Sequence, residues 1–179
     1  MGLELLNNLA EEPLALERHR AEISRNMAEP DQLIDEILLA SRLDARESDI
    51  GSIEAEGLVC LCAEECARVG ATLDVPPGLS QLVMQGVAKL PRRVVRNLLE
   101  NARRYGATTS EDLGIVLSLR SENQQVWLTG ADRGLGVPPE YRERIFEPFF
   151  RLPDASERVG GVGLGLQLVK SIAERHGGR

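Results

Sequence analysis

Two asparagines and an arginine recur at helical spacing in the stretch LPRRVVRNLLENARRYG, residues 90–106. Asn97, Asn101 and Arg104 stand at i, i+4 and i+7, so a helix would align them along one side. Asparagine is a poor helix former because its amide competes for backbone groups, so two stacked asparagines suggest a function. An amide oxygen suits Mg²⁺, which binds few protein groups together with substrate phosphates, and Arg104 could face those phosphates. Two exposed amides on a solvated helix face are the plainer interpretation.

A second polar constellation lies in LTGADRGLGVPPE, which contains Asp132, Gly134 and Gly136. A carboxylate at the end of a strand places a hydrogen-bond acceptor at the rim of a sheet. The glycines after it permit positive φ and leave room for a flat ligand. Such a carboxylate could accept a hydrogen bond from an adenine amino group. A plain turn is the alternative interpretation, since Asp-x-Gly is a common turn signal.

Glycines also crowd the stretch GGVGLGLQLVK, residues 160–170, where they lead from a polar loop into a helix-periodic segment. A helix N-terminus offers unpaired N–H groups and a partial positive charge, both of which suit a phosphate. The stretch contains neither G-x-x-x-x-G-K-[ST] nor G-x-G-x-x-G after a strand, so it predicts neither a P-loop nor a dinucleotide-binding fold. Residues 151–160 predict a loop that could act as a lid.

All phenylalanines of the chain, Phe146, Phe149 and Phe150, fall within five residues. Such clustering of scarce aromatic residues indicates a hook for a mobile segment or a partner helix. An apolar cluster beneath a loop is the alternative interpretation.

The elements that must position these residues alternate between helices and strands. Helices are predicted at about 57–69, 91–105 and 163–175, with a short helix near 138–145. Strands are predicted at about 71–75, 82–87, 114–120 and 125–131, the last two forming a hairpin around residues 121–124. This order predicts an α+β fold of the sandwich type, with a mixed sheet and helices on one face. Residues 44–57 are polar and irregular, and we place a domain boundary there.

The first part of the chain, residues 3–43, is predicted to be helical with an interruption near Pro13. A single apolar stripe runs along it, formed by Ile23, Met27, Ile34 and Leu38. Pro30 should bend the second helix. Because the stripe has no core of its own, we expect a partner helix from a second copy to cover it, giving a homodimer.

Charge and composition exclude several classes of protein. The net charge of -7 argues against nucleic-acid binding, which needs a basic surface. The sequence has no apolar run of the roughly 20 residues that a membrane span needs, and no signal peptide, so we expect a soluble chain. Cys60, Cys62 and Cys66 cluster on one predicted helix, and we expect buried free thiols. Arg92 and Arg93 are predicted to lie on a solvated helix face.

The order of the motifs is more informative than any single one. N-L-L-E-N-A, D-R-G-L-G, F-E-P-F-F-R and G-G-V-G-L-G-L follow one another at compact spacing. Together they resemble the N, G1, F and G2 boxes of the catalytic ATP-binding domain of bacterial sensor histidine kinases, members of the GHKL superfamily. The resemblance implies a GHKL-type sandwich over residues 45–179. Residues 1–44 resemble the dimerisation hairpin of these kinases, an antiparallel pair of helices that is truncated here.

The resemblance implies a role for each matching polar residue. Asn101 would coordinate Mg²⁺, with Asn97 beside it. Arg104 would contact a phosphate of ATP, and Tyr105 would flank the adenine. Asp132 would accept a hydrogen bond from the adenine amino group.

The glycine boxes are implied to shape the two ends of the nucleotide site. Gly134 and Gly136 would shape the adenine end. The residues implied on the phosphate side, where they line the site or hinge the lid, are Gly161, Gly163 and Gly165, with Arg158 at the γ-phosphate.

Two departures from the family pattern bear on activity. The family's phosphoacceptor histidine lies in an H-E-L-R-T-P-like stretch, and this sequence has none. Its two histidines, His19 and His176, lie elsewhere, and we expect both to be structural or solvent-facing. The sequence also stops at H-G-G-R, where the family adds strands. We therefore expect a piece of a longer protein, beginning with an added Met-Gly, that binds ATP and Mg²⁺ without phosphorylating itself.

For the intact protein, the resemblance implies transfer of the γ-phosphate of ATP to a histidine and then to an aspartate of a response regulator receiver domain. It also implies an inner-membrane sensor with this part in the cytoplasm. One alternative is a hydrolytic GHKL ATPase such as gyrase, which uses a glutamate as general base where this sequence has Asn97. Another is a non-catalytic dimerisation or regulatory module that has lost the nucleotide.

Overall fold

The structure is a computed structural model that describes residues 51–77, 79, 83–106, 114–123, 125–153 and 162–178. All of these residues belong to one compact unit of the chain. The helices predicted within residues 3–43 and the boundary at residue 44 lie outside the described residues.

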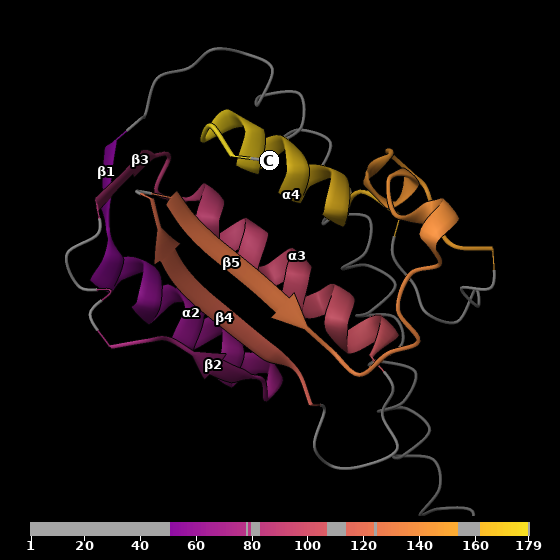
Figure 1. The fold of residues 1–179 in the computed structure, drawn as a ribbon, viewed down its shortest axis with the longest axis horizontal. Coiled ribbons are helices and arrows are strands. Elements are labelled where there is room, and N and C mark those ends of the chain that lie inside the picture. The colour runs from indigo at the N-terminus through magenta and orange to yellow at the C-terminus, as the bar shows by residue number, and fades with distance from the viewer. Residues whose placement is uncertain are drawn as a thin grey trace, which may run out of the picture. The chain divides into compact units, whose positions relative to one another are not determined.

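A three-stranded mixed sheet forms one layer of the fold (Figure 1). Strand β4, Val116–Glu122, is central; β2, Thr72–Asp74, pairs with it in parallel and β5, Gln125–Ala131, pairs with it antiparallel. The predicted hairpin and mixed sheet are therefore confirmed. The turn is two residues long rather than four, because Glu122 pairs with Gln125. Asn123 in this turn has a φ of 51°, a left-handed conformation that asparagine tolerates.

Three helices form the second layer. Helices α2, Ala55–Val69, and α3, Leu90–Tyr105, cover one face of the sheet, and α4, Gly165–Arg175, packs against α3 (Figure 1). The largest part of the core lies between sheet and helices and contains Leu58, Cys62, Cys66, Val95, Leu99, Ala102, Leu117 and Leu119. Leu117 and Leu119 alternate with half-buried residues on β4, the two-residue period of a strand with one buried face. This packing fixes α3 against the sheet, and α3 carries the candidate site.

A short strand was missed by the sequence analysis. Residues Gly51–Glu54 form β1, which pairs antiparallel with β3, Val83–Gly86. The prediction of an irregular segment was wrong here because β1 depends on its distant partner strand, and its own sequence carries little strand signal. Helix α2 then begins at Ala55, two residues before the predicted start.

Two further predictions need correction near the glycine boxes. The predicted short helix at 138–145 is a pair of 3₁₀-helices, η2 at Pro139–Tyr141 and η3 at Arg144–Phe146. Such short pieces are the usual setting for 3₁₀ geometry. Helix α4 starts at Gly165 rather than at residue 163, because Gly163 has a φ of +81° and cannot belong to a right-handed helix.

The cysteines are free, as predicted, but only two of them are buried. Cys62 and Cys66 belong to the core, whereas Cys60 is exposed. Burial, together with the neighbouring Cys66, raises the pKa of the Cys62 thiol to about 12, and burial also raises the pKa of Cys66. Both core thiols therefore stay protonated and unreactive. Within the described ranges, no helix combines the length and the apolar character that crossing a membrane requires.

Candidate functional site

Asn97 lies where α3 meets the beginning of α4. Its side chain is buried, with 8% of the residue exposed, so the interpretation of an exposed amide is wrong at this position. The first residue of α4 is Gly165, and a Cβ added there would stand 3.5 Å from Asn97 Oδ1. The Nδ2 atom of Asn97 is buried and has no hydrogen-bond partner in the described part of the chain. An unsatisfied buried donor is costly, so this amide needs an acceptor.

The N-terminus of α4 supplies more donors at the same place. Among the described residues, no side chain caps this helix end. The backbone N–H groups of a first helical turn have no partners within the helix, and the helix dipole makes that end positive. The amide of Asn97 and the start of α4 therefore converge on one region that favours an anion rich in hydrogen-bond acceptors.

The carboxylate of Asp132 lies beside the C-terminal end of α3. Its Oδ1 accepts a hydrogen bond from the Gly134 amide at 2.7 Å, which fixes the orientation of the exposed carboxylate. A Cβ added to Gly134 would stand 2.3 Å from the Tyr105 carbonyl oxygen and 2.8 Å from Asp132 Oδ1. Only glycine fits at residue 134, because the loop lies so close to the end of α3. At Gly136, by contrast, an added Cβ would meet no atom of the described residues within 4 Å, and the φ of +72° is what favours glycine there.

Asn101 and Arg104 lie on α3 between Asn97 and Tyr105, the last residue of the helix. Asn101 is half-buried, and Tyr105 is exposed. Arg104 is half-buried, and its guanidinium lies 4.0 Å from the Glu100 carboxylate one turn earlier. The same carboxylate lies 3.9 Å from Arg68 on α2. Arg104 is therefore held loosely on the α3 surface by an ion pair that a phosphate could replace.

The phenylalanine segment contacts the last glycine box at Gly163. The Phe149 amide donates a hydrogen bond to the Gly163 carbonyl oxygen at 3.0 Å. Phe149 itself has a φ of +63°, which is strained for a residue with a side chain, and it is 61% exposed. Phe150 stacks at 5.8 Å from the Tyr141 ring, and the Arg144 guanidinium lies 4.5 Å from the Phe150 ring centroid. Phe150 therefore belongs to a small aromatic cluster, whereas the side chain of Phe149 is exposed, and the hook stays a prediction.

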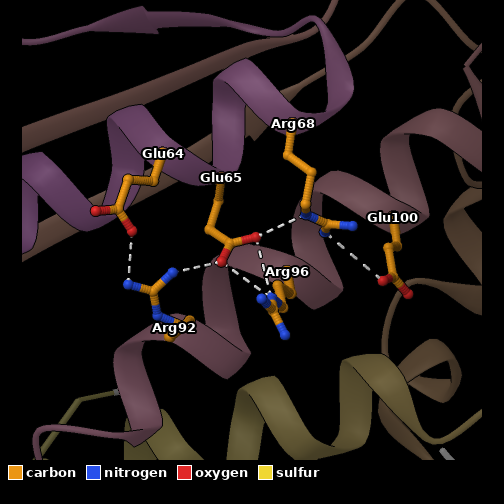
Figure 2. A network of polar contacts seen from close by, with 6 residues as sticks. All are labelled: Glu64, Glu65, Arg68, Arg92, Arg96 and Glu100. Atoms are coloured by element: carbon orange, nitrogen blue, oxygen red, sulfur yellow. Dashed lines mark hydrogen bonds and ion pairs between the residues drawn. The ribbon is translucent and has the colours of Figure 1, made fainter.

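An ion cluster joins α2 to α3 on the side of α3 that packs on α2 (Figure 2). Glu65 is 2% exposed and accepts hydrogen bonds from Arg92 at 2.7 Å and from Arg68 and Arg96 at 3.0 Å. Burial alone would raise the pKa of Glu65, but the hydrogen bonds from Arg96, Arg92 and Arg68 lower it to about 2. Arg92 also pairs with Glu64 at 2.8 Å, so the prediction that Arg92 is merely solvated is wrong.

The structure brings five of the sequence-predicted residues together in two groups. Asn97 meets Gly165 at the middle of α3, and Asp132 and Gly134 meet Tyr105 at its C-terminal end. Two predicted site residues, Gly161 and Arg158, lie outside the described residues.

Comparison with known proteins identifies the family. Residues 86–179 match the sequence model of the family described as histidine kinase-, DNA gyrase B- and HSP90-like ATPases. The chain belongs to this family. The sensor protein RstB of Escherichia coli (strain K12) is 34% identical over 195 residues, covering 98% of this chain and 44% of RstB. The sensor histidine kinase CpxA of the same strain is 32% identical over 186 residues, covering 99% of this chain and 38% of CpxA. The chain thus spans less than half the length of these relatives.

Solved structures of histidine kinases share the fold of this ATPase-family chain. A mycobacterial sensor histidine kinase, MprB, aligns with a TM-score of 0.56 at 25% identity, covering 72% of this chain and 80% of that one. Full-length ShkA in complex with AMPPNP aligns with a TM-score of 0.60 at 26% identity, covering 82% of this chain and 31% of that one. The predicted GHKL-type α+β fold is therefore confirmed, and the chain contains the ATPase-type domain of two-component sensor histidine kinases.

Proposed function

We propose that this chain binds ATP and Mg²⁺ as the ATP-binding kinase core of a two-component sensor histidine kinase. In the whole protein, the γ-phosphate would pass to a histidine and then to an aspartate of a response regulator. The observation that carries the proposal is the buried Nδ2 of Asn97 beside the start of α4, neither of which has a side-chain partner or cap among the described residues. A triphosphate oxygen would satisfy this donor and the N-terminal amides of α4 together.

The spacing along α3 fits a nucleoside triphosphate. From Asn97 to Tyr105 the helix rises by about 12 Å, so the two groups of candidate residues are far enough apart to contact different parts of one nucleotide. Asp132, held by the Gly134 amide, stands at the adenine end, where its carboxylate would accept a hydrogen bond from the adenine amino group. The phosphates would then lie toward Asn97 and the start of α4, with Gly163 and Gly165 leaving room for them.

Mg²⁺ fits the oxygen donors on the same helix face. The Oδ1 atom of the half-buried Asn101 is the ligand that this chain would offer, with phosphate oxygens completing the shell. When bound, the ion would neutralise charge on the phosphates during transfer. Arg104 would exchange its ion pair with Glu100 for a phosphate, which adds a second positive charge on the same side.

Transfer of the phosphoryl group to this chain's own histidines is not expected. Both ring nitrogens of His176 make contacts with backbone groups, at 3.2 Å to the Val87 nitrogen and 2.7 Å to the Ile172 oxygen. His19 does not lie in the acceptor motif of the family. Incubation with γ-labelled ATP should therefore leave no acid-labile label on the chain, and a label on His19 would contradict this expectation.

An ATP titration by calorimetry, with and without Mg²⁺, tests the proposed binding. Asp132→Asn places an amide donor against the adenine amino donor, and we expect roughly 10- to 100-fold weaker binding. Asp74→Asn is the matched control, because Asp74 is also exposed but pairs with Arg120 on the sheet. The control should bind ATP like the unchanged chain. Absence of saturable binding in the unchanged chain would favour a non-catalytic regulatory module instead.

ATP hydrolysis separates the kinase core from a hydrolytic ATPase of the same family. An amide at residue 97 cannot take a proton from water, so we expect negligible turnover. Glu100, the nearby carboxylate on α3, is occupied by Arg68 and Arg104. Steady hydrolysis by the unchanged chain, measured as released phosphate, would favour the ATPase, and Asn97→Glu tests whether a carboxylate at this position is sufficient.

A further inference from the structure

The closing helix α4 is fastened to the fold at both ends. Its first residue, Gly165, lies against Asn97 in the middle of α3. Just past its last turn, His176 contacts the segment that leads from β3 into α3. Helix α4 therefore runs antiparallel to α3 (Figure 1), and between the two ends Leu168 and Ile172 are buried.

The contacts of His176 determine its tautomer. The Val87 amide is a donor, so the Nε2 atom 3.2 Å away must be an unprotonated acceptor. The Ile172 carbonyl is an acceptor, so the Nδ1 atom 2.7 Å away must carry the ring hydrogen. The ring that makes both contacts is therefore neutral and protonated on Nδ1.

The packing of His176 leaves no room for a side chain at residue 86. A Cβ added to Gly86 would stand 2.3 Å from Cδ2 and Nε2 of the ring. Gly86 ends β3 and pairs with Gly51 of β1. The Val87 carbonyl oxygen in turn accepts a hydrogen bond from the Leu90 amide at 2.9 Å, which is the first hydrogen bond of the turn that starts α3. The histidine thus holds the end of α4 against the residues that set the start of α3.

We propose that His176 is a positioning residue of the nucleotide site. Its neutral ring holds α4 in register with α3, which keeps the start of α4 beside Asn97, and protonation of the ring weakens nucleotide binding. This inference rests on the proposed ATP site. A second ring hydrogen on Nε2 would face the Val87 amide hydrogen, so the contact to Val87 is lost when the ring becomes charged. The end of α4 is then released, and the donors at its start lose their fixed distance from Asn97.

Two substitutions distinguish the role of the hydrogen-bond acceptor at Nε2 from the effect of charging the ring. The amide group of His176→Gln can reach the position of Nε2, where its oxygen accepts from Val87 without titrating. His176→Asn is shorter; it can reach the Ile172 carbonyl but leaves the Val87 amide without an acceptor. Charged residues on the segments around the ring are unchanged in both variants: Glu54 on β1, Lys89 before α3, and Lys170, Glu174 and Arg175 on α4. Any effect of pH on these residues or on ATP itself is therefore the same in all three proteins and cancels when their affinities are compared.

The experiment measures the ATP–Mg²⁺ affinity of the three proteins at about pH 8 and at about pH 5.5. Between these conditions, the unchanged chain should lose roughly three- to ten-fold more affinity than His176→Gln. His176→Asn should bind more weakly than His176→Gln at the higher pH. Equal pH responses of the unchanged chain and His176→Gln would overturn the inference while leaving the ATP site intact. No binding by the unchanged chain at either pH would overturn the proposed function and this inference with it.

A second measurement needs no variant and does not depend on folding of the mutants. The Val87 amide should lose its protection from hydrogen exchange, and its nitrogen–proton signal should shift, as the ring of His176 charges. A Val87 signal that does not change while the His176 ring titrates would refute the coupling.

Discussion

The buried carboxylate of Glu65 gives the sharpest prediction about stability. It joins α2 to α3 through hydrogen bonds from three arginines, and its side chain is 2% exposed (Figure 2). Replacing it by glutamine removes the charge and turns an acceptor into a donor that faces guanidinium donors. A buried donor that faces other donors keeps its desolvation penalty without a compensating hydrogen bond. The folded state also loses the ion pairs that the carboxylate made.

The magnitude follows from the pKa of Glu65. The arginines lower it from an ordinary value of 4.5 to about 2 against the opposing effect of burial, a difference worth ~3 kcal/mol. The arginine side chains are 40 to 46% exposed and regain solvation when the carboxylate is lost. We therefore expect Glu65→Gln to lower the free energy of unfolding by about 2 kcal/mol at neutral pH.

The pH dependence has a definite sign. Because the folded-state pKa is the lower one, the stabilisation by Glu65 is fully present above about pH 4.5 and is lost as the pH falls toward about 2. The difference in unfolding free energy between the unchanged chain and Glu65→Gln should therefore shrink over that range. Urea unfolding followed by circular dichroism at several pH values measures it.

The neighbouring residue provides the control. Glu64 lies on the same helix, and its side chain is 64% exposed and pairs with Arg92 (Figure 2). Glu64→Gln should change the free energy of unfolding by less than about 0.5 kcal/mol. If the two variants were equally stable at neutral pH, the reasoning about the buried cluster would be refuted.

Two further predictions concern the glycine box and the thiols. Gly134→Ala should destabilise the fold by about 2 kcal/mol and weaken ATP binding, because its Cβ would meet the Tyr105 carbonyl oxygen at 2.3 Å. Gly136→Ala, with open space but a φ of +72°, should cost only about 1 kcal/mol, and equal thermal stabilities of the two variants would argue against the close approach. In the native chain a chromogenic disulfide reagent should modify Cys60 rapidly, with Cys62 and Cys66 reacting only after denaturation; rapid reaction of either buried thiol would contradict the packing of α2.

The helices and the hairpin could be predicted because their signals are local. The apolar period of α3 and the alternation along β4 appear in consecutive residues. Helix α3 lies within one residue of its predicted bounds, and β4 lies two residues later than predicted. Strand β1 could not be predicted, because Gly51–Glu54 contains a single apolar side chain and depends on pairing with β3. The position of a strand in a sheet is a tertiary property that a short window of sequence does not contain.

The candidate site was predictable in composition but not in its contacts. The spacing of Asn97 and Asn101 placed them on one helix side, but the sequence left open whether they are exposed. Only the packing of Gly165 on Asn97 decides that question. The ion cluster did leave a signal in the sequence that was overlooked. Glu65 falls on the same helical stripe as Leu58 and Cys62, and a carboxylate on a buried stripe needs cationic partners.

The most direct test of the account is a crystal structure of the chain with an ATP analogue and Mg²⁺. We predict the adenine amino group within hydrogen-bond distance of the Asp132 carboxylate, the ion on Asn101 Oδ1, and a phosphate oxygen on Asn97 Nδ2 at the start of α4. A nucleotide bound elsewhere, with these three side chains unchanged and without contact to it, would contradict the account.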